Sequence, residues 1–162
     1  MKIKIAVAAV AAAALLLFFG VRFFNAVHEK EWQIQRAAVQ TAYQKTILAK
    51  ADKVGRFVGD KPYTVIQGEN KIGQKMIVWV GDNEIYAQMA ADGVTADQIK
   101  AAVLAHQADA EIVRLLPGVL NGALVWEAFY KVESEEDGER YYYDYYSFKD
   151  GTMLDTYRLS IQ

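Results

Sequence analysis

The chain contains no cysteine among its 162 residues. Disulfide bonds, thiolate metal sites and lipid attachment at an N-terminal cysteine are therefore excluded. Histidine is nearly absent as well, with only two copies. His106, which is far along the chain from the other histidine, His28, lacks the accompanying Cys, His or Asp pairs of a metal site. We expect it to be a packed or surface side chain and predict no metal ligands.

An excess of basic residues is also missing. The 18 Lys and Arg residues are outnumbered by 20 Asp and Glu residues, which gives a net charge of −2. Three of the basic residues, Lys2, Lys4 and Arg22, lie near the N-terminus, so the remainder is more acidic still. Nucleic-acid binding requires clustered Lys and Arg that displace counterions, and the sequence argues against it.

Motifs of common enzyme classes are absent. No Gly-rich loop follows a predicted strand and opens a helix, so nothing supports phosphate binding. Ser134, Ser147 and Ser160 have no evident activating base. The sequence therefore predicts no catalytic residue, no cofactor and no small-molecule substrate.

Three carboxylates remain as candidates for acid–base chemistry. Glu127, Asp144 and Asp155 are predicted to share one face of a sheet, where split pKa values could allow general acid–base catalysis. The same face carries Arg114 and Lys131. A charged cross-strand network is the favoured interpretation, and an enzyme would require a pocket that gathers the three acids.

Proline and glycine are absent from Val21 to Val54. Trp32, Val39, Tyr43 and Ile47 recur there at helical spacing. The pattern predicts a helix that ends near Lys50 and is continuous with the segment before it.

That preceding segment is an unbroken run of 17 apolar residues, Ile5 to Val21. The run is at the short end of what crosses ~30 Å of hydrocarbon. Lys2 and Lys4 precede it, which predicts a single-pass anchor in the cell membrane with a cytoplasmic N-terminus and an extracytoplasmic body. A cleaved signal peptide is the competing interpretation, but no A-x-A site follows the run. The predicted anchor residues are Ile5, Val10, Leu15, Leu16, Leu17, Phe18, Phe19 and Val21.

Three dipeptides, Asn121-Gly122, Asp137-Gly138 and Asp150-Gly151, divide the last third of the chain. Such pairs tolerate the positive φ angles of tight hairpin turns. A helix should precede them, with a capping box over Thr95–Gln98. The same order of one helix and four strands is expected earlier. The predicted strands are Val54–Val58, Tyr63–Gln67, Lys75–Val80, Glu84–Met89, Glu111–Val119, Ala123–Glu133, Arg140–Lys149 and Thr152–Ser160.

These patterns predict an α+β protein of two similar units behind a membrane segment. We place the anchor at residues 1–25, the first unit at 26–91 and the second at 92–162. Each unit should be one helix packed on a four-stranded antiparallel sheet.

Two-residue turns would place Tyr130 opposite Tyr145 and Lys131 opposite Asp144. The face with Leu124, Trp126, Ala128 and Tyr130 should then be the core beneath the helix. The opposite face also carries large rings, so either the first unit covers it or a partner protein or glycan docks on it. A one-residue slip would exchange the two faces. The candidate partner-binding residues are Phe129, Lys131, Tyr142, Asp144, Tyr146, Asp155 and Tyr157.

The chain resembles a known family over nearly its whole length. The segments that carry the resemblance are Met76–Val80, Leu124–Tyr130 and Tyr145–Leu154, and they resemble the TseB-like (YpmB-like) cell-wall elongation regulators of Gram-positive bacteria. Similar endings occur in the wider PepSY and cystatin-like groups, although Ser147 replaces an aspartate often seen there.

The resemblance implies a membrane anchor that carries two cystatin-like domains outside the cell. It also implies a non-enzymatic regulator linked to a penicillin-binding transpeptidase, with no catalytic residues to transfer. The alternative is a protease-inhibitory or propeptide-like module at the cell surface. That module would act through the turns Gly68–Gly73 and Gly81–Asn83.

Overall fold

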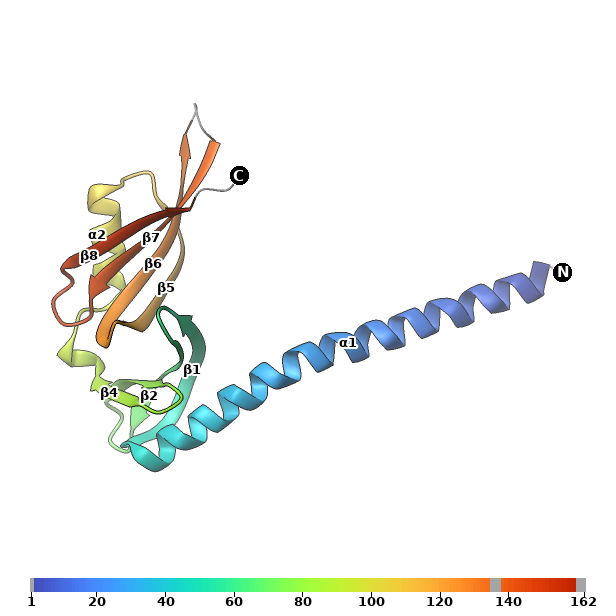
Figure 1. Ribbon diagram of the computed structural model, residues 1–162, viewed down its shortest axis with the longest axis horizontal. Helices are drawn as coiled ribbons and strands as arrows, with labels where there is room; N and C mark the ends of the chain where they lie inside the picture. Colours follow the sequence, from blue (N-terminus) through green and yellow to red (C-terminus); the bar gives the residue numbers. More distant parts are fainter. Residues whose placement is uncertain (1, 135–137, 160–162) are drawn as a thin grey trace. The chain divides into compact units, whose positions relative to one another are not determined.

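The computed structural model describes the backbone of residues 2–134 and 138–159. Before residue 29, the exposure of the side chain is described only for Leu15, Phe18, Phe19, Gly20 and Arg22. The side chain of Ser134 is not described. Residues 1–37 form one compact unit and residues 38–162 form another, which contains both sheets. In the structure, "first unit" and "second unit" denote these two ranges rather than the two predicted from the sequence. The elements in chain order are α1 (Lys2–Lys45), β1 (Leu48–Val58), β2 (Pro62–Asn70), β3 (Lys75–Val80), β4 (Ile85–Met89), η1 (Ala90–Asp92), α2 (Ala96–His106), β5 (Glu111–Leu120), β6 (Ala123–Ser134), β7 (Gly138–Ser147) and β8 (Met153–Leu159) (Figure 1).

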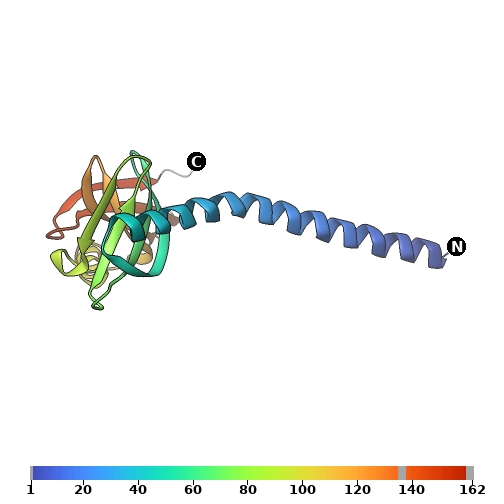
Figure 2. The same cartoon turned by 90° about the horizontal axis from the view of Figure 1, so that it is seen from below.

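The first unit is helical throughout its described part, and α1 continues without interruption into the second unit (Figure 2). Among the residues described, no helix is long and apolar enough to cross a membrane. Most of the predicted anchor falls on side chains outside the described residues, namely Ile5, Val10, Leu16, Leu17 and Val21. The other three, Leu15, Phe18 and Phe19, are exposed.

The end of α1 lies earlier than predicted. The helix stops at Lys45 rather than near Lys50. Thr46 closes it, because its backbone N–H and its hydroxyl both donate to the Ala42 carbonyl, while its Oγ1 accepts from the Leu48 N–H at 3.1 Å. β1 therefore begins at Leu48, and the prediction of a first strand from Val54 was wrong. The sequence did not indicate this start, because most of the residues between Leu48 and Val54 are polar or small and lack the apolar pattern of a strand.

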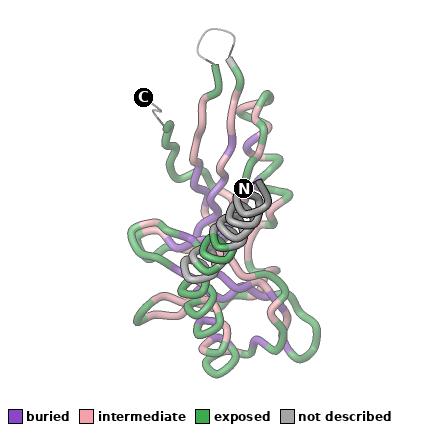
Figure 3. The backbone as a smooth tube through the Cα atoms, turned by 90° about the vertical axis from the view of Figure 1, so that its right-hand side faces the viewer, coloured by how far each residue is buried: buried purple, intermediate pink, exposed green. Residues whose placement is uncertain are grey.

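The first sheet is an antiparallel meander in the order β1-β2-β3-β4, as predicted. Alternate residues of β2 and β3 point to opposite faces. One face, with Ile66 and Val78, packs beneath Ala38 and Ala42 at the end of α1. The other face carries Val65 and Trp79 into a second core cluster. The central strands β2 and β3 are thus buried on both faces, whereas much of β1 and β4 stays exposed (Figure 3).

The second sheet is antiparallel in the order β5-β6-β7-β8, and α2 lies on one of its faces. The predicted capping box is present: Thr95 Oγ1 accepts from the Gln98 N–H, and the Gln98 side chain accepts from the Thr95 N–H. Ile99 and Val103 are the buried residues of α2. They share a core with the predicted helix-facing residues Trp126, Ala128 and Tyr130, all buried, whereas Leu124 is half-buried.

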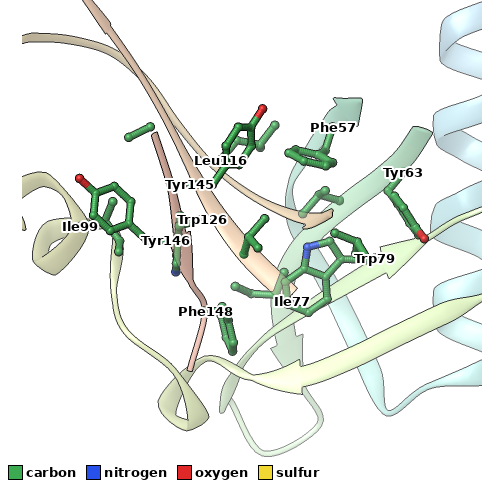
Figure 4. Packing of buried hydrophobic residues seen from close by; sticks show 14 of the residues in the cluster. Phe57, Tyr63, Ile77, Trp79, Ile99, Leu116, Trp126, Tyr145, Tyr146 and Phe148 are labelled. Carbon is green, nitrogen blue, oxygen red and sulfur yellow. The ribbon is translucent and has the colours of Figure 1, made fainter. Parts of the chain in front are cut away.

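The two sheets share that core cluster. Phe57 of β1 lies directly against Gly118 of β5, where a Cβ atom would stand only 2.3 Å from the ring. Nearby, Trp79 and Phe148 meet edge to face with their ring centroids 5.5 Å apart (Figure 4). The first sheet therefore covers one end of the second sheet's face opposite α2.

The segment between the sheets is fixed to the second one. The Val94 N–H donates to the Phe148 carbonyl at 2.8 Å, and Trp126 Nε1 donates to the Val94 carbonyl at 2.9 Å. Gly93 lies so close to Phe148 that a Cβ atom would be 2.4 Å from the Phe148 carbonyl oxygen. The connection is consequently an ordered part of the second unit.

The predicted register of β7 was wrong by three residues. Tyr130 is opposite Tyr142, and Lys131 is opposite Tyr141. Gly138, with φ of 69°, is already paired with Ser134, so the connection is longer than a two-residue Asp137-Gly138 turn. Residues 135–137 themselves lie outside the described residues. An odd shift exchanges the faces of a strand, and it places Tyr142, Asp144 and Tyr146 on the α2 side.

The connection from β7 to β8 is also longer than predicted. The Gly151 N–H donates to the Ser147 carbonyl, and a bulge follows Tyr145, which is opposite Asp155. Tyr146 is therefore opposite Met153. By contrast, Asn121-Gly122 forms the predicted two-residue turn, with φ of 51° and 79° between the paired Leu120 and Ala123.

A carboxylate joins β2 to the start of β4. Glu84 accepts from the Tyr63 hydroxyl, from Lys61 Nζ at 3.0 Å and from the Tyr86 hydroxyl at 2.9 Å. The Tyr63 bond first, and then those from Lys61 and Tyr86, lower the pKa of Glu84 from 4.5 to about 2. This carboxylate is ionised in the folded protein at neutral pH.

We expect Gly118→Ala to lower the free energy of unfolding by about 1–3 kcal/mol, because the new methyl group overlaps the Phe57 ring. Gly55→Ala is the matched control, since its Cβ would meet only the flexible end of Leu116 at 3.3 Å. Urea unfolding of both variants measures the difference. Equal losses would contradict the proposed close approach of the sheets.

We expect Glu84 to stabilise the fold in a pH-dependent way. Its folded-state pKa is depressed, so its contribution is complete above the ordinary pKa of 4.5 and is lost as the pH falls through about 2. The difference in unfolding midpoint between wild type and Glu84→Gln should shrink over that interval. Tyr63→Phe removes the strongest bond and should move this loss to higher pH. A difference that does not vary with pH would argue against the depressed pKa.

Candidate functional site

The three carboxylates considered for acid–base chemistry do not share one face. Asp144 is opposite Ala128 and lies on the α2 side of the second sheet, while Asp155 is opposite Tyr145 on the other side together with Glu127. The prediction of a common face was wrong, because it depended on the register of β7. The structure therefore does not assemble the acidic pocket that an enzyme would require.

Asp144 is the centre of a buried polar network. Its carboxylate is 0% exposed, and it accepts from Thr156 Oγ1 at 2.8 Å and Tyr146 Oη at 3.2 Å. His106 Nε2 lies 3.1 Å from the same carboxylate, and His106 Nδ1 faces the Ala102 carbonyl. Burial first, and then the neighbouring Asp144, raise the pKa values of Tyr130 and Tyr146. All these groups hold α2 to the sheet, which gives His106 a structural position.

Glu127 is nearly as well buried, at 3% exposure, on the opposite side of the sheet. Arg114 Nη2 donates to it at 2.6 Å, and the Tyr145 hydroxyl donates at 3.2 Å. The Arg114 guanidinium also lies 5.9 Å from the centre of the Phe129 ring. Both carboxylate oxygens are occupied, so Glu127 fixes Arg114 rather than offering a free base.

Aromatic rings continue along this side of the sheet. Phe129 stacks with Tyr143 at 4.5 Å and with Tyr141 at 5.6 Å between ring centroids. Tyr157, 53% exposed, meets Tyr145 edge to face at 5.9 Å. We name this surface the outer aromatic face and define it by Phe129, Lys131, Tyr141, Tyr143, Asp155 and Tyr157.

Charged groups at the border of the outer aromatic face are paired. Lys131 Nζ lies 3.0 Å from Glu139 and 3.2 Å from Glu111, and these carboxylates raise the pKa of Lys131. The Tyr141 hydroxyl donates to Glu139 at 2.8 Å. Rings held by such contacts lose little further side-chain entropy when a partner binds, which suits a recognition surface.

The predicted partner-binding residues divide between the two faces. Phe129, Lys131, Asp155 and Tyr157 lie on the outer aromatic face, whereas Tyr142, Asp144 and Tyr146 lie beneath α2. The sequence interpretation missed Tyr141 and Tyr143, which replace them. The sequence did contain a signal for them, because the run Tyr141–Tyr146 is rich in tyrosine. Deciding which of these tyrosines lie on the outer side required the correct register of β7. Whether any of these residues binds a partner stays a prediction.

No metal site is visible in the described part of the chain, where no group of three His, Asp or Glu side chains could hold an ion. Asp144 and Glu127 use their oxygens within the protein. On the outer aromatic face, stacked rings lie beside charged groups that are already paired.

Asp144→Asn should lower the free energy of unfolding by about 1–3 kcal/mol, because an amide nitrogen in place of one buried carboxylate oxygen cannot accept the hydrogen bonds that Asp144 accepts and leaves a donor unpaired. Asp155→Asn is the matched control on the exposed neighbouring strand, where the change should stay within about 0.5 kcal/mol. Chemical denaturation measures both. If Asp155→Asn costs as much as Asp144→Asn, the network has been assigned to the wrong residue.

Comparisons with known proteins agree with one another. Residues 37–81 match the family model described as "Cell wall elongation regulator TseB-like domain". The "Probable cell wall elongation regulator TseB" of Bacillus subtilis (strain 168) is 28% identical over 149 residues, which cover 87% of this chain and 86% of that protein. The solved structure of the YpmB protein from Bacillus subtilis is similar with a TM-score of 0.64 and 26% identity, over 75% of this chain and 94% of that one. These three comparisons confirm the resemblance to the TseB-like cell wall elongation regulators that was inferred from the sequence.

Proposed function

We propose that this protein is a membrane-anchored, non-enzymatic regulator of cell wall elongation that binds a penicillin-binding transpeptidase outside the cytoplasm. The observation that carries the proposal is the similarity to a probable cell wall elongation regulator along 87% of the chain. A likeness of that extent covers most of the chain rather than one motif.

The anchor in this proposal is the apolar run Ile5–Val21, preceded by Lys2 and Lys4. Under the positive-inside rule these lysines stay in the cytoplasm and the second unit faces outward. The uninterrupted helix α1 then joins the anchor to the sheets.

The outer aromatic face is the surface we assign to the partner. Tyrosine is enriched at protein interfaces because its ring buries a large area and its hydroxyl can still bond. Here the first sheet covers one end of the sheet face, through Phe57, and leaves Tyr157 at the other end 53% exposed. Neighbouring charges are already paired, so docking there would not leave a bare charge buried.

Two observations support a regulator over an enzyme. The buried carboxylates Asp144 and Glu127 are bonded on both oxygens, and they lie on opposite sides of the sheet. The relatives are also named as a regulator rather than by a reaction. The protease-inhibitory alternative would act through the turns Gly68–Gly73 and Gly81–Asn83, which are hydrogen-bonded: the Gly73 N–H donates to the Asn70 carbonyl and the Gly81 N–H donates to the Glu84 carbonyl.

Photo-crosslinking in cells tests the proposal. A benzoylphenylalanine at Tyr143 or Tyr157 of the full-length chain should capture a penicillin-binding transpeptidase, because both positions lie on the outer aromatic face. The captured protein is identified by mass spectrometry. The control position is Lys100, an exposed residue of α2 on the opposite side of the same sheet.

Each result has one meaning. Capture from Tyr143 and Tyr157 but not from Lys100 supports the partner and its surface together. Capture from Lys100 alone keeps the partner and moves the surface to α2. If chains that restore wild-type elongation capture no transpeptidase from any position, the proposed mechanism is wrong.

A further inference from the structure

A concave surface lies where the end of α1 meets the turn between β2 and β3. It has a volume of about 470 Å³ and lies entirely within the second unit. We name it the Ile47–Ile72 notch. Its lining residues are Tyr43, Thr46, Ile47, Leu48, Asn70, Lys71 and Ile72.

The notch exposes apolar side chains that have no role in the core. Ile72 is 78% exposed, Ile47 is 63% exposed and Tyr43 is 43% exposed. Single exposed aliphatic residues are common on protein surfaces, but a group gathered in one concavity marks an interaction site.

Local hydrogen bonds hold Ile72 in this exposed position. Asn70 Oδ1 accepts from the N–H groups of both Ile72 and Gln74 at 3.0 Å, and its Nδ2 donates to the Gln74 side chain. The Gly73 N–H donates to the Asn70 carbonyl, and Gly73 has φ of 79°. This turn is thus built around the side chain and backbone of Asn70.

The opposite wall is fixed in the same manner. Thr46 bonds to Ala42 on one side and to Leu48 on the other, so Ile47 between them cannot fold back onto the helix. The Tyr43 hydroxyl accepts from the Ala51 N–H at 3.0 Å, which orients the ring. Both walls are therefore preorganised, and binding there would cost little ordering entropy.

The charge of the notch defines its occupant. Lys71 is the single charged residue of the lining, and Lys45 stands one residue before the Thr46 that closes the helix. Within the described part of the chain, neither lysine forms an ion pair. No acidic side chain lines the notch. A complementary ligand has a carboxylate beside an aliphatic side chain.

We propose that the Ile47–Ile72 notch binds an acidic, aliphatic segment of a partner protein. The aliphatic side chain enters between Ile47 and Ile72, and the carboxylate pairs with Lys71. This inference goes beyond the proposed function, because the notch is separate from the outer aromatic face and does not require its partner to be a transpeptidase.

Selection from a random twelve-residue peptide library on the full-length chain tests it. Enriched peptides should contain Asp or Glu next to Leu, Ile or Val. A synthetic copy of the enriched peptide should lose at least about tenfold in affinity for Ile72→Asp, since a new charge replaces the apolar contact and repels the acid. Binding is measured by fluorescence anisotropy.

Charge reversal and a matched control make the test specific. Lys71→Glu should lower the affinity for the enriched peptide. A peptide with Lys in place of its acidic residue should regain affinity for the Lys71→Glu variant. Val113→Asp, at another exposed aliphatic residue outside the notch, should bind as wild type does. Both aspartate variants change exposed positions, so their unfolding midpoints provide a check on folding.

Four outcomes overturn the inference: no enrichment, enrichment of acid-free peptides, binding that Ile72→Asp leaves unchanged, or a concentration-dependent dimer that Ile72→Asp abolishes. The last would show that a second copy of the chain occupies the notch. None of them bears on the transpeptidase, which the crosslinking from Tyr143 and Tyr157 decides separately.

Discussion

The close approach of Phe57 to Gly118 is the contact on which the arrangement of the two sheets depends. Each sheet with its helix is small, and a domain of about 60 residues buries only about 60% of its unfolded surface. The core cluster that the two sheets share contains Trp79, Trp126 and Phe148, so these rings contribute to the core of both sheets. Because a side chain at position 118 would overlap the Phe57 ring, glycine there permits the sheets to bury each other.

The buried acids show how the second sheet uses polar chemistry. Asp144 joins α2, β7 and β8 through His106, Tyr146 and Thr156, while Glu127 fixes Arg114 on the other side. A buried charge is tolerated only when its bonds are satisfied. These carboxylates therefore position the aromatic rings of both faces from within the sheet.

Sequence patterns predicted the elements well and their register poorly. Asn121-Gly122 gave the correct turn because both residues adopt positive φ and nothing else is inserted. At Gly138 the same dipeptide signal misled, since the glycine belongs to β7 and the connection is longer. The three-residue shift then moved Tyr142 and Asp144 to the helix side and brought Tyr141 and Tyr143 outward. Four of the six residues that define the outer aromatic face could therefore be predicted, and the other two, Tyr141 and Tyr143, needed the pairing of β6 with β7.

The connection around Gly93 and Val94 has a consequence for the lifetime of the protein. Proteases cleave segments that can leave the fold locally, and this one is bonded to Phe148 and Trp126. A cut between the two sheets therefore requires that the shared core open first. The two sheets would persist or be degraded together, and the amount of intact protein would follow the stability of the whole second unit.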